Sequence, residues 1–225
     1  EGKMQNFIRT LGVLSLLSLV LFGCGGGGGG GSRSGSKGVR VLHASVDSAP
    51  FLLSTSAKEG EVLQTSKFSF ADRYFALPGG EQIVSASSAV GAPVFAFTVP
   101  EDRPERQTIL VYGSRTESGV KAALLSDEWK DVPPDMSALR FVHGVEGVRS
   151  IDAAVGSVSV GQGVSVGSAS LYVTVPAGPQ QIVVRQSGSS SALYTATVDL
   201  LPGRAYSLLA AGEHGYFMMV RLVED

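Results

Sequence analysis

The sequence has one cysteine, one tryptophan and three histidines among its 225 residues, and only 17% of its residues are charged. A single cysteine allows no disulfide within the chain, and so few cysteines and histidines leave little material for a metal cluster. The formal net charge of −2 provides no excess of basic residues for neutralising phosphates, so a nucleic-acid partner is not expected. Hydrophobic residues make up 44%, which is enough to build a packed core.

The longest apolar run lies near the start of the chain and leads to the cysteine. Residues 11–22 follow Arg9 and are too few to cross about 30 Å of hydrocarbon, so residues 1–23 are typical of an export signal. The sequence Leu-Phe-Gly-Cys at 21–24 resembles the lipobox of bacterial lipoproteins, whose cysteine thiol carries a diacylglyceryl group. We therefore expect Cys24 to be lipidated and to anchor the protein in the bacterial cell envelope. Because glycine rather than aspartate follows Cys24, the outer membrane is favoured over the inner membrane.

Residues 24–38 are dominated by glycine and serine, with seven consecutive glycines directly after the cysteine. This segment has no apolar side chains to bury after Cys24, so it is predicted to be a flexible tether between the lipid and a folded body.

The rest of the chain is predicted to be two copies of one module. Five segments recur in the same order, and each second occurrence follows the first by 98 to 100 positions. The clearest pairs are Val39–His43 with Leu139–His143, Tyr74–Gly80 with Tyr172–Gly178, and Ala122–Asp127 with Val220–Asp225. We place the first repeat at residues 39–130 and the second at 138–225. A linker at 131–137 contains the paired prolines Pro133 and Pro134, which favour an extended backbone.

Each copy is built from short apolar runs separated by turn residues, without a sustained helical period. Leu171, Val173 and Val175 alternate with polar residues as in a half-buried strand, and Gly161–Gly163 between two valine-serine alternations indicates a strand, a turn and a second strand. Short strands at this spacing predict an all-β protein with two tandem β-sandwiches.

The residues that open the first copy carry a family resemblance. Val39–Pro50 is similar to the motif V-R-V-V-H-A-S-P-D-A-P of the domain of unknown function 4397, and Tyr172–Gly178 and Leu200–Tyr206 match its later elements. The first copy departs from the motif at Val46, and the second departs more strongly at residues 144–148. The resemblance implies exported bacterial envelope modules with an immunoglobulin-like sandwich and no established activity.

His43 and His143 occupy equivalent positions in the two copies and share strand parity with apolar residues, so both should point inward. One alternative is a metal ligand or general base. We favour a buried structural imidazole bonded to a nearby loop, with Asp47 or Glu146 as a partner close in sequence. One histidine per module falls short of the three or four ligands that zinc needs, so no metal or other cofactor is expected.

Trp129 lies beside the linker and is interpreted as packing between the copies, with a binding anchor as the alternative. The chain has no G-x-S-x-G nucleophile motif. We therefore expect a membrane-anchored, non-enzymatic envelope lipoprotein that acts as a binding or structural module for an envelope protein or glycan. The alternative is an enzyme or accessory subunit, such as a glycan-processing one, with its site at the interface of the two repeats.

Overall fold

A computed structural model describes residues 38–57, 64–68 and 74–225 of the chain. The expected signal peptide, Cys24 and almost all of the tether lie outside these residues. The described part contains strands and turns but no helix, and so no helix there is long and apolar enough to span a membrane. The all-β sandwich architecture predicted from the sequence is confirmed.

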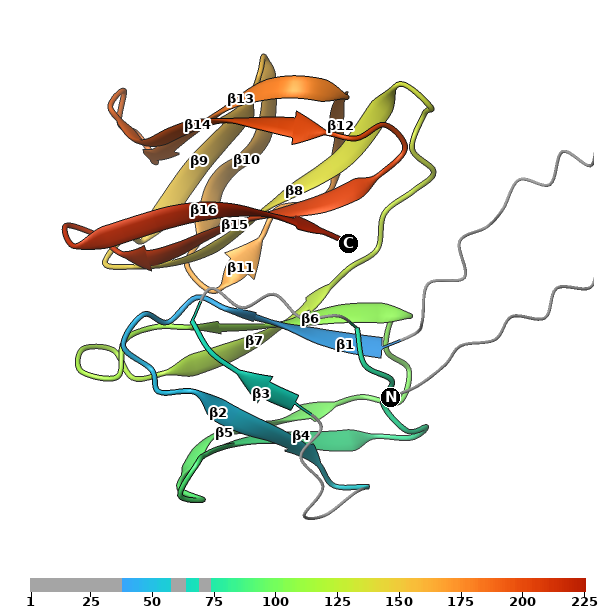
Figure 1. Ribbon diagram of the computed structural model, residues 1–225, viewed down its shortest axis with the longest axis vertical. Helices are drawn as coiled ribbons and strands as arrows, with labels where there is room; N and C mark the ends of the chain where they lie inside the picture. Colours follow the sequence, from blue (N-terminus) through green and yellow to red (C-terminus); the bar gives the residue numbers. More distant parts are fainter. Residues whose placement is uncertain (1–37, 58–63, 69–73) are drawn as a thin grey trace, which may run out of the picture. The chain divides into compact units, whose positions relative to one another are not determined.

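The first repeat forms two sheets, which Figure 1 shows in blue and green. One sheet has the order β1-β6-β7 and the other has the order β3-β2-β4-β5. β1 pairs with β6 in parallel, whereas the other pairs are antiparallel. The strands are β1 (Gly38–His43), β2 (Phe51–Thr55), β3 (Gln64–Ser66), β4 (Gln82–Ser88), β5 (Pro93–Val99), β6 (Arg106–Tyr112) and β7 (Lys121–Ser126).

The second repeat follows the same plan with longer strands. Its sheets have the orders β11-β8-β15-β16, with β12 also paired to β8, and β10-β9-β13-β14. β8 and β15 are parallel, as β1 and β6 are in the first repeat. The strands are β8 (Met136–Glu146), β9 (Ser150–Val155), β10 (Val158–Ser165), β11 (Ser168–Ala169), β12 (Val173–Pro176), β13 (Gly178–Gln186), β14 (Ala192–Leu200), β15 (Ala205–Glu213) and β16 (Phe217–Glu224).

Two local expectations for the second repeat are wrong. Residues 158–165 form the single strand β10 and do not turn back at the glycines. The pairing of β10 with β9 shifts register twice in this stretch. Asp152 of β9 accepts a hydrogen bond of 2.7 Å from the Gly163 amide, and Gly163 has φ +59°, so the strand bulges there and continues. Leu171 precedes β12 and is 86% exposed, although the alternation had placed it in a half-buried strand.

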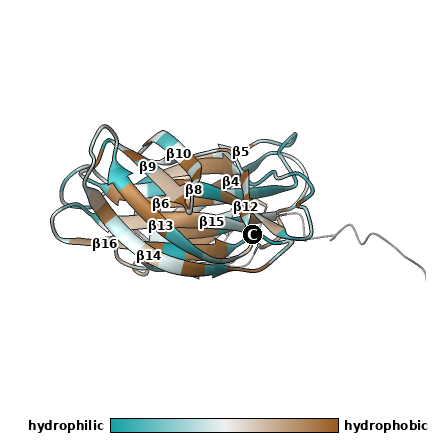
Figure 2. Cartoon of the chain, turned by 90° about the horizontal axis from the view of Figure 1, so that it is seen from above, coloured by the Kyte–Doolittle hydropathy of each residue, from teal (hydrophilic) through white to brown (hydrophobic). Residues whose placement is uncertain are grey.

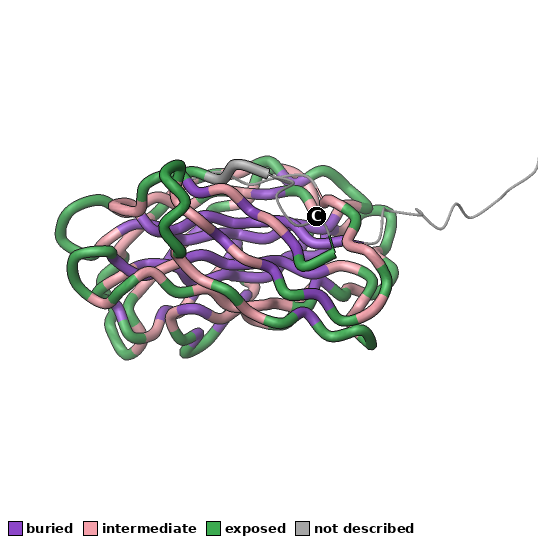
Figure 3. The backbone as a smooth tube through the Cα atoms, turned by 90° about the horizontal axis from the view of Figure 1, so that it is seen from below, coloured by how far each residue is buried: buried purple, intermediate pink, exposed green. Residues whose placement is uncertain are grey.

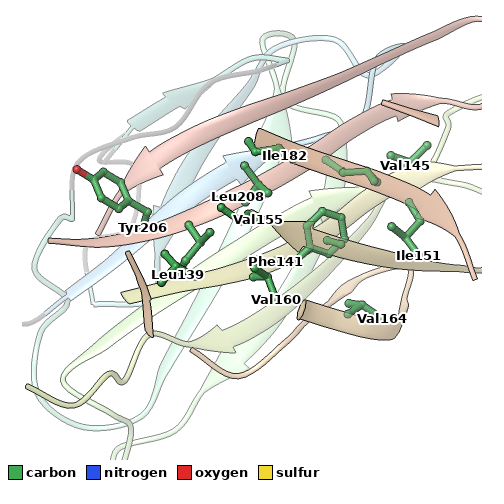
Figure 4. Close-up of a cluster of buried hydrophobic side chains, with 14 of the residues drawn as sticks. Leu139, Phe141, Val145, Ile151, Val155, Val160, Val164, Ile182, Tyr206 and Leu208 are labelled. Carbon is green, nitrogen blue, oxygen red and sulfur yellow. The ribbon is translucent and has the colours of Figure 1, made fainter. Parts of the chain in front are cut away.

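The strands in the middle of the molecule are buried on both faces. All six residues of β1 are buried, and so are nine consecutive residues of β8 (Figure 3). One face of each strand packs into its own sandwich, as Phe141, Val155 and Ile182 do in the second repeat (Figure 4). The other face packs against the other repeat. Polar residues gather in the loops and apolar ones along the central strands (Figure 2).

A third apolar cluster joins the two repeats. Leu42 and Leu110 of the first repeat pack with Val142 and Leu209 of the second, and all four are at most 1% exposed. Burying a leucine or valine side chain contributes about 1.5–3 kcal/mol. This cluster therefore supplies a substantial apolar contribution to holding the repeats together.

β1 and β8 run in the same sense. Ala44 lies so close to Gly144 that a Cβ on this glycine would clash, and Arg40 and Arg140 both bond Thr108. Equivalent residues of the two repeats are therefore close to each other both at Arg40 and at Ala44, so the two strands are parallel. As a result, the β6–β7 and β15–β16 hairpin tips lie at the same end, opposite Gly38 (Figure 1).

Candidate functional site

The densest group of ionisable side chains lies between the two repeats. Arg40 and Leu42 alternate along β1 with residues that face the first sandwich core, so these two side chains face the other repeat. On an isolated sandwich Arg40 would meet water, but here its side chain is only 1% exposed. Arg140 occupies the equivalent position on β8 and is equally buried.

Each arginine forms an ion pair with an aspartate of the other repeat. Arg40 pairs with Asp225, which follows β16, and Arg140 pairs with Asp127, which follows β7. Both aspartate side chains are fully buried. A buried charge is strongly destabilising without a partner, so in the joined repeats each arginine is compensated by an aspartate of the other repeat.

Two hydroxyl groups connect the ion pairs. Arg40 Nε donates to Thr108 Oγ1 at 2.9 Å, and that hydroxyl donates to Asp127 Oδ2 at 2.6 Å. In the second repeat, Arg140 Nε donates to Ser207 Oγ at 2.8 Å, and this hydroxyl donates to an oxygen of Asp225 at 3.0 Å. The arrangement has pseudo-twofold symmetry, with threonine replaced by serine.

Two tyrosines complete what we call the inter-repeat cluster. Tyr74 donates to Asp127 at 2.6 Å, and Tyr172 donates to Asp225 at 2.7 Å. Each tyrosine ring also lies 4.9 Å from the guanidinium carbon of the arginine in its own repeat. The cluster comprises Arg40, Tyr74, Thr108, Asp127, Arg140, Tyr172, Ser207 and Asp225.

Burial and neighbouring charges shift the pKa of three side chains of the cluster, Arg40, Tyr74 and Tyr172. Burial raises the pKa of Tyr74 and Tyr172, and the nearby aspartates add to the increase. Burial alone would lower the pKa of Arg40, but the negative charges of Asp225 and Asp127 outweigh it and raise this pKa. The tyrosines therefore remain hydrogen-bond donors and Arg40 remains a cation. With its carboxylates fully buried and bonded, the cluster can brace the repeats but cannot receive a substrate.

Trp129 lies at the edge of this cluster. Its ring centroid is 5.6 Å from that of Tyr172 in the second repeat and 4.9 Å from the guanidinium carbon of Arg106 in the first repeat. The side chain is half-buried and contacts both repeats. This geometry accords with packing between the copies, and a separate role as a binding anchor stays untested.

The two histidines singled out from the sequence are completely buried, His43 as the last residue of β1 and His143 within β8. His143 Nε2 lies 2.9 Å from the Val148 carbonyl, and the Val145 amide donates to Nδ1 at 3.2 Å. Nε2 therefore carries the proton and the ring is neutral. Burial lowers the pKa of both imidazoles to about 4, against a smaller opposing effect of backbone hydrogen bonds at Lys67 and Val148.

Asp47 is engaged elsewhere than at the histidine. It accepts hydrogen bonds from the Arg115 and Thr116 amides and from the Ser114 hydroxyl, at 2.7–3.1 Å. Burial would raise its pKa, but these bonds lower it to about 2. Asp47 thus fixes the β6–β7 hairpin to the end of β1. In the second repeat the Val148 carbonyl, rather than Glu146, is the partner of the imidazole.

Among the described residues no three histidine, cysteine or acidic side chains are grouped so that they could hold a metal ion. The inter-repeat cluster was not among the sites predicted from the sequence, although the internal repeat contains a signal for it. An arginine, a tyrosine and an aspartate recur at equivalent positions in both copies. When polar residues are retained in both copies, and the arginine lies within a strand, they are expected to have buried partners. The sequence does not show that those partners belong to the other repeat.

The match to a known family concerns the second repeat. Residues 137–225 match the family model described as "Domain of unknown function (DUF4397)". This supports the family resemblance for one of the two copies. No curated protein matches the chain.

Two solved structures align over most of the chain. One is a carbohydrate-binding module of family CBM26 from Eubacterium rectale Amy13K in complex with maltoheptaose, with 8% identity, 82% of this chain and 96% of that chain covered, and a TM-score of 0.26. The other is a proposed cell adhesion protein from Bacteroides ovatus, with 11% identity, 84% and 96% covered, and a TM-score of 0.24. Scores this low carry no argument about a shared fold or ligand.

Proposed function

We propose that the protein is a lipid-anchored, non-enzymatic component of the bacterial envelope whose two repeats act together as one binding or structural module. The observation that carries this proposal is the inter-repeat cluster. It joins the repeats through two crossed ion pairs, and the apolar cluster around Leu42 and Leu209 lies alongside it.

The same cluster counts against an enzyme with its site at the interface of the repeats. A glycosidase needs two carboxyl groups about 5–10 Å apart that the substrate can reach. Asp127 and Asp225 are the carboxylates that converge there among the described residues, and both are fully buried and bonded to arginine and tyrosine.

A tethered body suits presentation to a partner. The sequence that precedes Gly38 enters at one end of β1, and the β6–β7 and β15–β16 tips lie at the opposite end (Figure 1). A lipid at Cys24 would be connected through residues 25–37 to the end of β1 that lies opposite these tips. We therefore expect an envelope partner to reach the module from the end with these tips or from its sides.

Membrane fractionation tests the anchor. The intact protein should partition with membranes, and mass spectrometry should find a lipid-modified Cys24 at the mature N-terminus. A Cys24→Ser variant should carry no lipid at this position and should not be cleaved there. An unmodified Cys24 in the mature wild-type protein would refute the proposed lipid anchor. The binding role is tested separately, by capture of envelope components on the immobilised full-length chain.

A further inference from the structure

The second repeat carries an open groove away from the inter-repeat cluster. It has a volume of about 620 Å³ and lies along β10, β11 and the segment that leads into β12. β10 is the edge strand of one sheet and β11 is the edge strand of the other. The groove therefore runs between two sheet edges, where backbone N–H and C=O groups face outward.

The lining of the groove is uncharged and combines polar with apolar residues. Ser159, Gln162 and Ser165 are exposed lining residues, and the buried Val160 and Val164 also line the groove. None of the described residues that line it carries a charge. A charged ligand would lose its hydration there without gaining an opposite charge, and a purely apolar ligand would leave the hydroxyl and backbone groups unpaired.

Leu171 stands at the rim and is 86% exposed. A large apolar side chain this exposed contributes almost no burial energy to the fold, and it leaves apolar surface available at the groove. Together with the hydroxyl and amide groups of Ser159 and Gln162, it gives the groove a mixture of apolar and hydrogen-bonding surface. Pyranose rings present the matching mixture of C–H faces and hydroxyl groups.

A peptide that adds as a further strand to β10 fits less well. Strand addition requires regularly spaced backbone groups along the edge. β10 has register shifts between Ser159 and Gly161 and between Gly161 and Val164. These bulges interrupt the regular spacing, as bulges at sheet edges commonly do.

We propose that this groove binds a neutral polysaccharide, with Leu171 contacting the sugar face and Ser159 and Gln162 bonding hydroxyl groups. The proposal rests on the binding role proposed above and names its ligand class. Affinity electrophoresis of the full chain in detergent tests it, with starch, laminarin, mannan or dextran in the gel, and with alginate as a charged comparison.

Two groove variants and two matched controls decide the outcome. Leu171→Ala should weaken binding by about tenfold, and Ser159→Asp should abolish it by placing a charge in the groove. Leu201→Ala removes a leucine that is 51% exposed outside the groove, and Ser190→Asp adds a carboxylate at the exposed β13–β14 hairpin. Both controls should bind like the wild-type protein.

Retardation by at least one neutral polysaccharide, weakened only in the groove variants, would support the proposal. It would be overturned if none of the four polysaccharides retards the chain, if alginate retards it as strongly, or if groove and control variants behave alike. Should immobilised full chain still capture envelope components in any of these cases, the groove assignment fails while the broader binding role stands.

Discussion

Removing one member of the Arg40–Asp225 pair should destabilise the protein far more than surface changes do. The guanidinium of Arg40 donates to a carboxylate, two hydroxyl groups and a backbone carbonyl, namely those of Asp225, Thr108, Ser207 and Glu224. Arg40→Met retains an apolar side chain of similar reach but leaves the buried Asp225 carboxylate without its cation. Breaking a buried pair in this way costs about 3–5 kcal/mol, and we expect a loss of that size in the free energy of unfolding.

An exposed ion pair within the second repeat provides the control. Arg204 Nη1 lies 2.7 Å from Glu224 Oε1, and these side chains are 37% and 49% exposed. Arg204→Met should therefore cost about 0–1 kcal/mol. In a double-mutant cycle, Arg40→Met combined with Asp225→Asn should cost less than the sum of the single changes, because the second change removes the charge that the first left unpaired.

Urea unfolding followed by Trp129 fluorescence and by far-ultraviolet circular dichroism measures these differences. Trp129 is the only tryptophan and lies next to Tyr172 of the cluster, so its emission reports on the interface. The reasoning fails if Arg40→Met costs no more than Arg204→Met, or if the two changes at the buried pair are additive.

Three further expectations concern the histidines and the separate repeats. The free energy of unfolding should fall as the pH drops from 6.5 to 4, by up to about 3 kcal/mol per imidazole. The reason is that the histidines of the unfolded chain are protonated near pH 6.5, whereas the buried His43 and His143 are protonated only near pH 4. A free energy that does not change with pH in urea titrations would contradict this. His143→Ala should lower stability by about 1–3 kcal/mol in metal-free buffer. The structural role would be refuted if the wild-type protein binds zinc stoichiometrically and this variant loses that binding without a change in stability. Chains spanning residues 39–130 and 135–225 should each unfold cooperatively, with lower stability than the intact protein. If calorimetry shows that either chain is unfolded on its own, the two repeats share one core to which the interface is essential.

The local sequence pattern was sufficient to predict strands that have one apolar and one polar face. The alternation around Val173 and Val175 predicted a strand, and β12 includes both residues. The pattern failed at Gly161–Gly163, because glycine permits both a turn and a bulge. The hydrogen bond from Gly163 to Asp152, a residue 11 positions earlier, selects the bulge, and no local pattern contains it.

The inter-repeat cluster could be predicted only in part. Strand parity correctly placed His43 and His143 inside, since they follow the apolar positions of their strands. The same parity assigns Arg40 to the outer face, where a single sandwich would expose it to water. Its burial depends on a second sandwich covering that face, which is a tertiary fact that periodicity within one strand does not encode.

A polar cluster at this place has a physical consequence that an apolar one would lack. Flat sheet faces covered with leucine and valine can pack in several registers at similar energy, whereas crossed bonds between Arg40 and Asp225 and between Arg140 and Asp127 form in one register only. Any sliding of the repeats would leave four buried charges unpaired, at a cost of several kcal/mol for each broken pair. We infer that the apolar cluster supplies the attraction between the repeats and that the ion pairs select their register.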